Sequence, residues 1–133
     1  MSKKENIPIN NDLDIVIARQ RGREIAKGFG FSPIDLALIA TAISELTRNI
    51  ITYAEKGSVS LQLIEEEGRK GILVISIDKG PGIKNIELAL QDGYSTTNSL
   101  GLGLPGVRRL MDEFEIQSEL GKGTTITIKK WIC

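Results

Sequence analysis

The chain has 133 residues, 41% of them hydrophobic and 26% charged, which is the composition of an ordinary globular domain. Lys and Arg total 17 and Asp and Glu total 17, so net charge gives no reason to expect binding to nucleic acid or to an anionic membrane. There is no histidine and one cysteine, Cys133, which excludes Ser-His-Asp and Cys-His catalysis, zinc sites with His ligands, a phosphohistidine on this chain and an intrachain disulfide.

The N-terminal residues carry neither a signal-peptide core nor a spanning segment. Residues 1–6 are polar, so we expect them to be disordered. No apolar run approaches the roughly 20 residues of a membrane span. We therefore expect a cytoplasmic protein without a membrane partner, folded as a single domain over 1–133.

The first half of the chain predicts a short strand and two helices. The strand covers 7–9, at a sheet edge because Pro8 lacks a backbone donor. A helix is expected over 10–30, capped by Asn11 or Asp12 and ended by Gly28 and Gly30. A longer helix is expected over 32–57, because Ser32 is a good N-cap, a proline follows it and a glycine closes it.

The second half predicts strands with interspersed helices. Strands are expected over 58–67 and 71–78, and helices over 85–91 and 105–114. A hairpin turning at Gly-Lys-Gly is expected over 115–132. A helical half followed by such strands predicts an α+β fold, a two-layer α/β sandwich with helices on one sheet face.

Two polar residues, Glu45 and Asn49, lie four apart on the long helix and therefore share one face. Taken alone, the pair is compatible with an ordinary solvated helix surface. The functional alternative is that Asn49 offers a neutral oxygen to Mg²⁺ while Glu45 holds a proton or orients a hydroxyl.

A carboxylate ends the predicted strand at Asp78 and is followed by Gly80 and Gly82. A surface turn that starts with Asp is the simpler interpretation. The alternative is a binding site for a flat ligand with an amino group, since the carboxylate accepts hydrogen bonds and glycine lets the ligand approach the backbone.

Glycines at positions 101, 103 and 106 precede the predicted helix 105–114. They either allow close packing or open backbone N–H groups to an anion such as phosphate. No Gly-Lys-Ser/Thr follows, so this is not a P-loop, and the stretch follows a polar loop, which argues against a dinucleotide fingerprint. In the terminal hairpin, a Thr hydroxyl near the turn could donate to a ring nitrogen or to a water beside a base.

The order of these parts resembles the N, G1, G2 and G3 boxes of the Bergerat (GHKL) ATP-binding superfamily, over about residues 9–131. Within it the chain is similar to the bacterial serine/threonine switch kinases of stressosome partner-switching pathways. The similarity rests on "DIVIARQRGREIAKGFGF", "TAISELTRNIITYA", "DKGPGI", "DGYSTT" and "GLGLPGVRRLMDEF". It implies a Bergerat-type mixed sheet covered by helices on one face.

The resemblance also implies a role for each site residue, with ATP and Mg²⁺ as ligands. Glu45 would be the general base and Asn49 would coordinate the magnesium. Asp78 would bind the adenine amino group, and residues 84–100 would form the ATP lid. The remaining nucleotide contacts would come from Gly80 and Gly82 at the base, from Gly101, Leu102 and Gly103 at the phosphates, and from Thr124 or Thr125 at the adenine.

The implied activity is phosphorylation of Ser or Thr on a STAS-domain substrate or scaffold of the stressosome, followed by release and activation of a PP2C-type phosphatase. No basic residue precedes Gly101, so the charge partner of the transferred phosphate is unidentified, and Arg48, Arg108 and Arg109 are the candidates. Two other functions stay open. One is an anti-sigma factor that sequesters a sigma subunit, and the other is a detached histidine-kinase catalytic domain.

Overall fold

The structure is a computed structural model that describes residues 4–82 and 103–132. The predicted helix 85–91 and the whole of the predicted ATP lid, 84–100, lie outside these residues. No described helix is both long and apolar enough to cross a membrane. The elements are β1 (Glu5–Ile9), α1 (Asp12–Phe29), α2 (Pro33–Ala54), β2 (Gly57–Glu66), β3 (Arg69–Asp78), α4 (Gly103–Leu110), β4 (Glu113–Glu119) and β5 (Gly123–Trp131).

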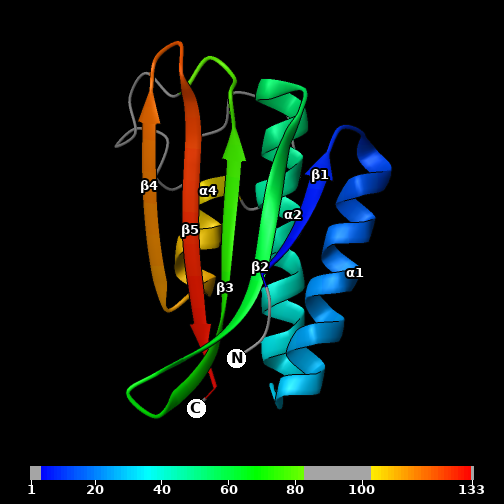
Figure 1. The fold of residues 1–133 in the computed structure, drawn as a ribbon, viewed down its shortest axis with the longest axis vertical. Helices are drawn as coiled ribbons and strands as arrows, with labels where there is room; N and C mark the ends of the chain where they lie inside the picture. The colour runs from blue at the N-terminus through cyan, green and yellow to red at the C-terminus, as the bar shows by residue number, and fades with distance from the viewer. Residues whose placement is uncertain (1–3, 83–102, 133) are drawn as a thin grey trace.

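The described strands form one sheet in the order β1-β2-β3-β5-β4 (Figure 1). Each of their pairings is antiparallel, so the expectation of a mixed sheet is wrong for the described strands. For two of the four pairings the physical reason is local, because tight turns join β2 to β3 and β4 to β5 and reverse the chain. The predicted edge position of Pro8 is confirmed, because β1 pairs only with β2.

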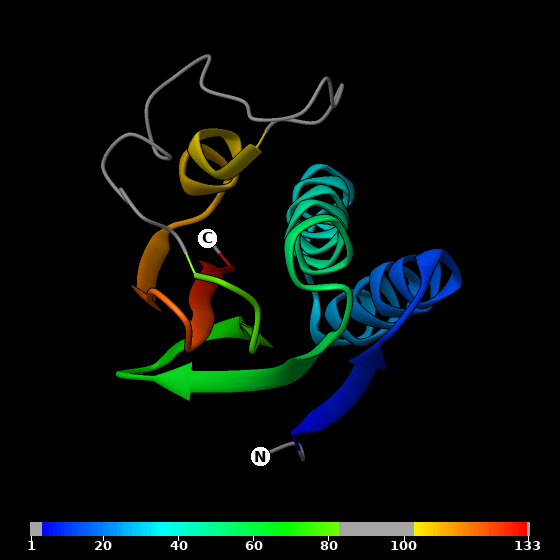
Figure 2. The ribbon, with the colours of Figure 1, turned by 90° about the horizontal axis from the view of Figure 1, so that it is seen from above.

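All three described helices cover the same face of the sheet, with α2 between α1 and α4 (Figure 2). The predicted two-layer arrangement is therefore confirmed. The core fills the space between the layers, because the inward positions of the strands alternate with outward ones. Helix α4 adds Val107 to its largest fully buried side chains, and most of the others come from the strands and from α2: Ile9, Val59, Leu61, Ile72, Val74 and Ile128, with Ile39, Ile43, Leu46 and Ile50.

Order begins earlier at the N-terminus than the polar composition suggests. Glu5 and Asn6 belong to β1 and pair with Leu61 and Ser60, so the expectation of disorder through residue 6 is wrong for these two residues. A long-range ion pair explains this, since the Arg21 guanidinium on α1 donates to Glu5 at 2.9 Å. The hydrogen bond to Glu5 and its charge raise the pKa of Arg21 above the ordinary value.

The helix caps follow the sequence signals. Asn11 caps α1 by accepting from the Asp14 N–H at 3.2 Å, and Gly30 ends it in the left-handed conformation. Ser32 caps α2 by accepting from the Asp35 N–H at 3.2 Å. The far end of α2 differs, because the helix stops at Ala54 and Gly57 is already the first residue of β2.

The predicted helix 105–114 is shifted, since α4 runs from Gly103 to Leu110. The next residues are held by β5 instead. The Asp112 N–H donates to the Lys129 carbonyl at 3.0 Å, and the Asp112 carboxylate accepts from the Trp131 N–H at 2.7 Å. Phe114 then lies in β4, opposite Ile128. The helical spacing of Leu110 and Phe114 is thus overridden by pairing with a strand that comes later in the chain.

Candidate nucleotide site

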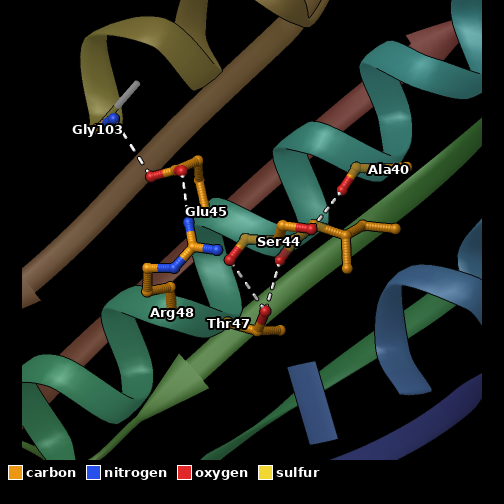
Figure 3. Close-up of polar contacts among 7 residues, drawn as sticks. Ala40, Ser44, Glu45, Thr47, Arg48 and Gly103 are labelled. Carbon is orange, nitrogen blue, oxygen red and sulfur yellow. Dashed lines mark hydrogen bonds and ion pairs between the residues drawn. The ribbon is translucent and has the colours of Figure 1, made fainter. Parts of the chain in front are cut away.

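Glu45 occupies the middle of α2, and its side chain is only 7% exposed. Its carboxylate has two partners, shown in Figure 3. One oxygen accepts from Nη1 of Arg48 at 2.7 Å, and the other accepts from the backbone N–H of Gly103 at 3.3 Å. A buried carboxylate without such donors would carry a large desolvation cost. Glu45 therefore joins α2 to the first residue of α4.

Two hydroxyls near Glu45 donate hydrogen bonds to backbone carbonyls of α2 itself. Ser44 donates to the Ala40 carbonyl at 3.0 Å, and Thr47 donates to the Ile43 carbonyl at 2.8 Å (Figure 3). Such bonds satisfy a hydroxyl inside the helix and leave it with a structural role. Asn49 is half-buried and lies one turn after Glu45, so the two residues share one face of α2.

The predicted carboxylate at a strand end is confirmed, because Asp78 is the last residue of β3. Its Oδ1 accepts from the Gly80 N–H at 2.9 Å, which closes an Asp-initiated turn. The surface turn is therefore confirmed, and the binding of a flat ligand with an amino group stays a prediction. The turn uses one carboxylate oxygen, and the other oxygen is available to a ligand.

Gly80 and Gly82 allow this turn to pack tightly against its neighbours. A Cβ atom on Gly80 would lie 2.6 Å from the Cβ of Ala54, at the end of α2. Gly82 has φ +80°, and a Cβ there would overlap the Glu119 carbonyl oxygen in the β4–β5 hairpin. Close packing between segments of this chain thus accounts for both glycines. Contact of these glycines with an adenine ring stays a prediction.

Replacing Gly80 by alanine should displace the Asp78 turn from α2 and destabilise the fold by about 1–3 kcal/mol. Chemical denaturation with a circular dichroism readout measures this. The matched control is Gly28→Ala, since Gly28 lies in α1 with no atom within 4 Å of an added Cβ. We expect the control to stabilise the protein by about 0.5–1 kcal/mol. Equal effects of both substitutions would contradict the packing role of Gly80.

The two candidate threonines point to opposite faces of the sheet. Thr124 pairs with Asp78 across β3 and β5, so both side chains face the helices. Thr125 pairs with Ile77 on the other face, and is therefore not brought together with Asp78. Sequence alone could not choose between adjacent threonines, because a shift of one residue in register exchanges their faces.

Ser118 is a neighbour of this site that the sequence analysis missed. Its Oγ lies 2.8 Å from the Thr124 Oγ1 and 3.2 Å from the Gly123 carbonyl oxygen. When Ser118 donates to that carbonyl, Thr124 supplies the proton between the two hydroxyls. In that arrangement the Thr124 oxygen is an acceptor next to Asp78, and the expected donation from its hydroxyl to a base stays a prediction. No motif in the sequence marks Ser118.

Gly103 begins α4 with φ +67°, a conformation that glycine adopts without strain. Its backbone N–H has no partner within the helix, as at every helix start, and donates instead to Glu45. Gly101 and Leu102 lie outside the described residues. Arg108 and Arg109 stand in the last turn of α4, at the opposite end from Gly103.

Helix α2 connects the two halves of the candidate site. Its C-terminal residue Ala54 contacts the Asp78 turn through Gly80, whereas Glu45 contacts the start of α4. Nine residues of helix separate these positions, about 14 Å at 1.5 Å per residue. This span is comparable to an extended nucleoside triphosphate. An adenine at Asp78 and a phosphate near Glu45 are thus compatible with the spacing.

Comparisons with known proteins agree with this architecture. The profile of the family described as Histidine kinase-, DNA gyrase B-, and HSP90-like ATPase matches residues 34–131. Serine/threonine-protein kinase RsbT of Bacillus subtilis is 48% identical over 132 residues, which is 99% of each chain. An anti-sigma F factor of Clostridium kluyveri is 34% identical over 101 residues, covering 72% of this chain and 70% of that relative.

Among solved structures, the RsbU and RsbW domains of a Mycobacterium tuberculosis protein superimpose with a TM-score of 0.68 at 20% identity. The match covers 97% of this chain and 32% of that longer one, and at this identity it supports the fold alone. Both the family match and the full-length relative at 48% identity confirm the resemblance found in the sequence. The chain belongs to the histidine kinase-, DNA gyrase B- and HSP90-like ATPase family, as a homologue of the serine/threonine-protein kinase RsbT.

Proposed function

We propose that this chain is an ATP- and Mg²⁺-dependent protein serine/threonine kinase that acts on a STAS-domain protein of a stressosome. The observation that carries the proposal is the buried Glu45 carboxylate, held beside the backbone N–H that begins α4. Full-length identity of 48% to a serine/threonine-protein kinase supports it. We place this reaction in the cytoplasm, where ATP is available.

In the proposed reaction, a Ser or Thr hydroxyl of the partner attacks the γ-phosphorus of ATP. A bond forms between the hydroxyl oxygen and phosphorus, and the bond to the β–γ bridging oxygen breaks, so that ADP leaves. Glu45 accepts the hydroxyl proton. Its bonds to Arg48 and to the Gly103 N–H hold the carboxylate in position for this step. Phosphoryl transfer depends mainly on positioning and charge neutralisation, so a chain without histidine can perform it.

The nucleotide would be held along α2. Asp78 would accept a hydrogen bond from the adenine amino group with the oxygen that Gly80 does not use. Thr124 would assist at the base, as it shares the face of Asp78, and Thr125 would not. The backbone of Gly101, Leu102 and Gly103 would contact the phosphates.

Asn49 would hold the magnesium ion. The described residues contain no group of three or more Asp, Glu, Cys or His side chains suited to a metal. A single amide oxygen still fits Mg²⁺, because this ion keeps several waters and takes further oxygens from substrate phosphates. When bound, it neutralises phosphate charge.

Phosphorylation would release the kinase from its scaffold and let it activate a PP2C-type phosphatase. The test is a pull-down with the purified chain as bait, with and without Mg-ATP. We expect a STAS-domain protein without nucleotide and a PP2C-type phosphatase after turnover. Capture of the same partners in both states would contradict the exchange.

A second function, sequestration of a sigma subunit, is favoured by the 34% identity to an anti-sigma F factor. The same pull-down separates the two functions. Recovery of a sigma subunit in place of the STAS-domain protein and the phosphatase would select the second function.

A further inference from the structure

In the sequence of α2, Arg48 lies between the candidate base Glu45 and the candidate magnesium ligand Asn49. It precedes Asn49 in α2, and its Nη1 lies 2.7 Å from one oxygen of Glu45. The two partners differ in burial, since the Arg48 side chain is 44% exposed and that of Glu45 is 7% exposed. The other Glu45 oxygen is bonded to the N–H of Gly103. The Glu45 carboxylate therefore links the Arg48 guanidinium to the first residue of α4 (Figure 3).

We propose that Arg48 is the charge partner of the ATP phosphates. Its guanidinium moves from Glu45 to an oxygen of the γ-phosphate when ATP binds. The inference rests on the proposed function, because it places the phosphates near Glu45 and Gly103. A guanidinium fork matches phosphate as well as carboxylate. The exchange is favoured because a triphosphate carries more negative charge than one carboxylate.

The burial difference determines which partner can move. Glu45 is fixed by its surroundings and keeps the Gly103 N–H as a second donor, so it remains paired when Arg48 leaves. Arg48 is partly in solvent, where ion pairs are weak and rearrange readily. The other candidate cations, Arg108 and Arg109, lie in the last turn of α4 and not at its Gly103 end.

The exchange would also link nucleotide binding to the state of the base. While Arg48 occupies one oxygen of Glu45, that oxygen has a donor already. Once the guanidinium has moved to phosphate, the oxygen can accept the proton of the substrate hydroxyl. Arg48 would thus supply charge to the phosphate and release the base in one movement.

The experiment compares a nucleotide that lacks the γ-phosphate with one that carries it. Calorimetry would measure binding of ADP and of the non-hydrolysable β,γ-imido analogue of ATP, each with Mg²⁺, to the wild type, Arg48→Ala, Arg48→Gln and Arg23→Ala. We expect both Arg48 variants to bind the analogue roughly 10- to 100-fold more weakly, the loss of one charge-assisted hydrogen bond, with ADP affinity unchanged. Arg23 is an exposed arginine of α1, and its variant should match the wild type.

The second variant guards against misfolding. Arg48→Gln keeps a donor for Glu45 without the charge. It therefore tests the proposal even when Arg48→Ala has a lowered thermal stability. A wild-type affinity of Arg48→Gln for the analogue, or equal weakening for both nucleotides, would overturn the inference. Faster phosphoryl transfer by the Arg48 variants would also overturn it, since Arg48 would then only restrain Glu45. A wild-type protein that binds neither nucleotide would overturn the proposed function itself, and is a separate result.

Discussion

Glu45→Gln should lower phosphoryl transfer to the partner about 10²- to 10⁴-fold, the range expected when a general base is removed. Nucleotide binding should stay near the wild-type level, because glutamine keeps the shape of the side chain and one acceptor oxygen for the Gly103 N–H, while the partly exposed Arg48 can turn to solvent. The measurements are single-turnover transfer from Mg-ATP and calorimetric titration with ADP.

A matched control for this substitution is Glu24→Gln. Glu24 is an exposed carboxylate of α1 that pairs with Arg21 at 3.3 Å. Such pairs contribute little, so neither transfer nor stability should change measurably. Transfer at the wild-type rate by Glu45→Gln would mean that the proton goes elsewhere. Loss of ADP binding would instead indicate that Glu45 only holds α4 in place.

Asp78→Asn should weaken ATP binding by roughly 10- to 100-fold, the loss of a hydrogen bond to a charged acceptor. The turn should survive, because the amide oxygen can still accept from the Gly80 N–H. The amide NH₂ group then replaces the second carboxylate oxygen and faces the adenine amino group, donor against donor. Calorimetry measures the affinity, and thermal denaturation confirms the fold.

The same substitution should change base preference. Inosine triphosphate carries an acceptor oxygen in place of the adenine amino group, so Asp78→Asn should favour it over ATP relative to the wild type. Asp12→Asn, at an exposed residue in the first turn of α1, is the control and should leave both affinities unchanged. An unchanged ratio of the two affinities in Asp78→Asn would argue against adenine binding at this carboxylate.

The parts of the fold that depend on near neighbours were predictable from the sequence. Asn11 and Ser32 cap their helices within a few residues, and Asp78 ends a strand whose apolar run is visible in the chain. The end of α4 was not predictable, because the bonds that stop it come from Lys129 and Trp131 in β5. Local periodicity does not contain such long-range pairing.

The candidate site also has parts that local sequence predicts and parts that depend on long-range contacts. Glu45 and Asn49 are visible because four residues separate them on one helix. The bond between Glu45 and Gly103 joins residues 58 apart, and the side-by-side position of Asp78 and Thr124 depends on strand register. The packing of Gly80 against Ala54, which explains why glycine stands there, is likewise visible only in the tertiary structure.

Phosphopeptide mass spectrometry of a STAS-domain partner, after incubation with this chain and Mg-ATP, tests the central claim most directly. The kinase proposal predicts phosphate on Ser or Thr of the partner with the wild type, and strongly reduced phosphate with Glu45→Gln and Asp78→Asn. Absence of phosphoserine and phosphothreonine with the wild type, or equal phosphorylation by both variants, would contradict it.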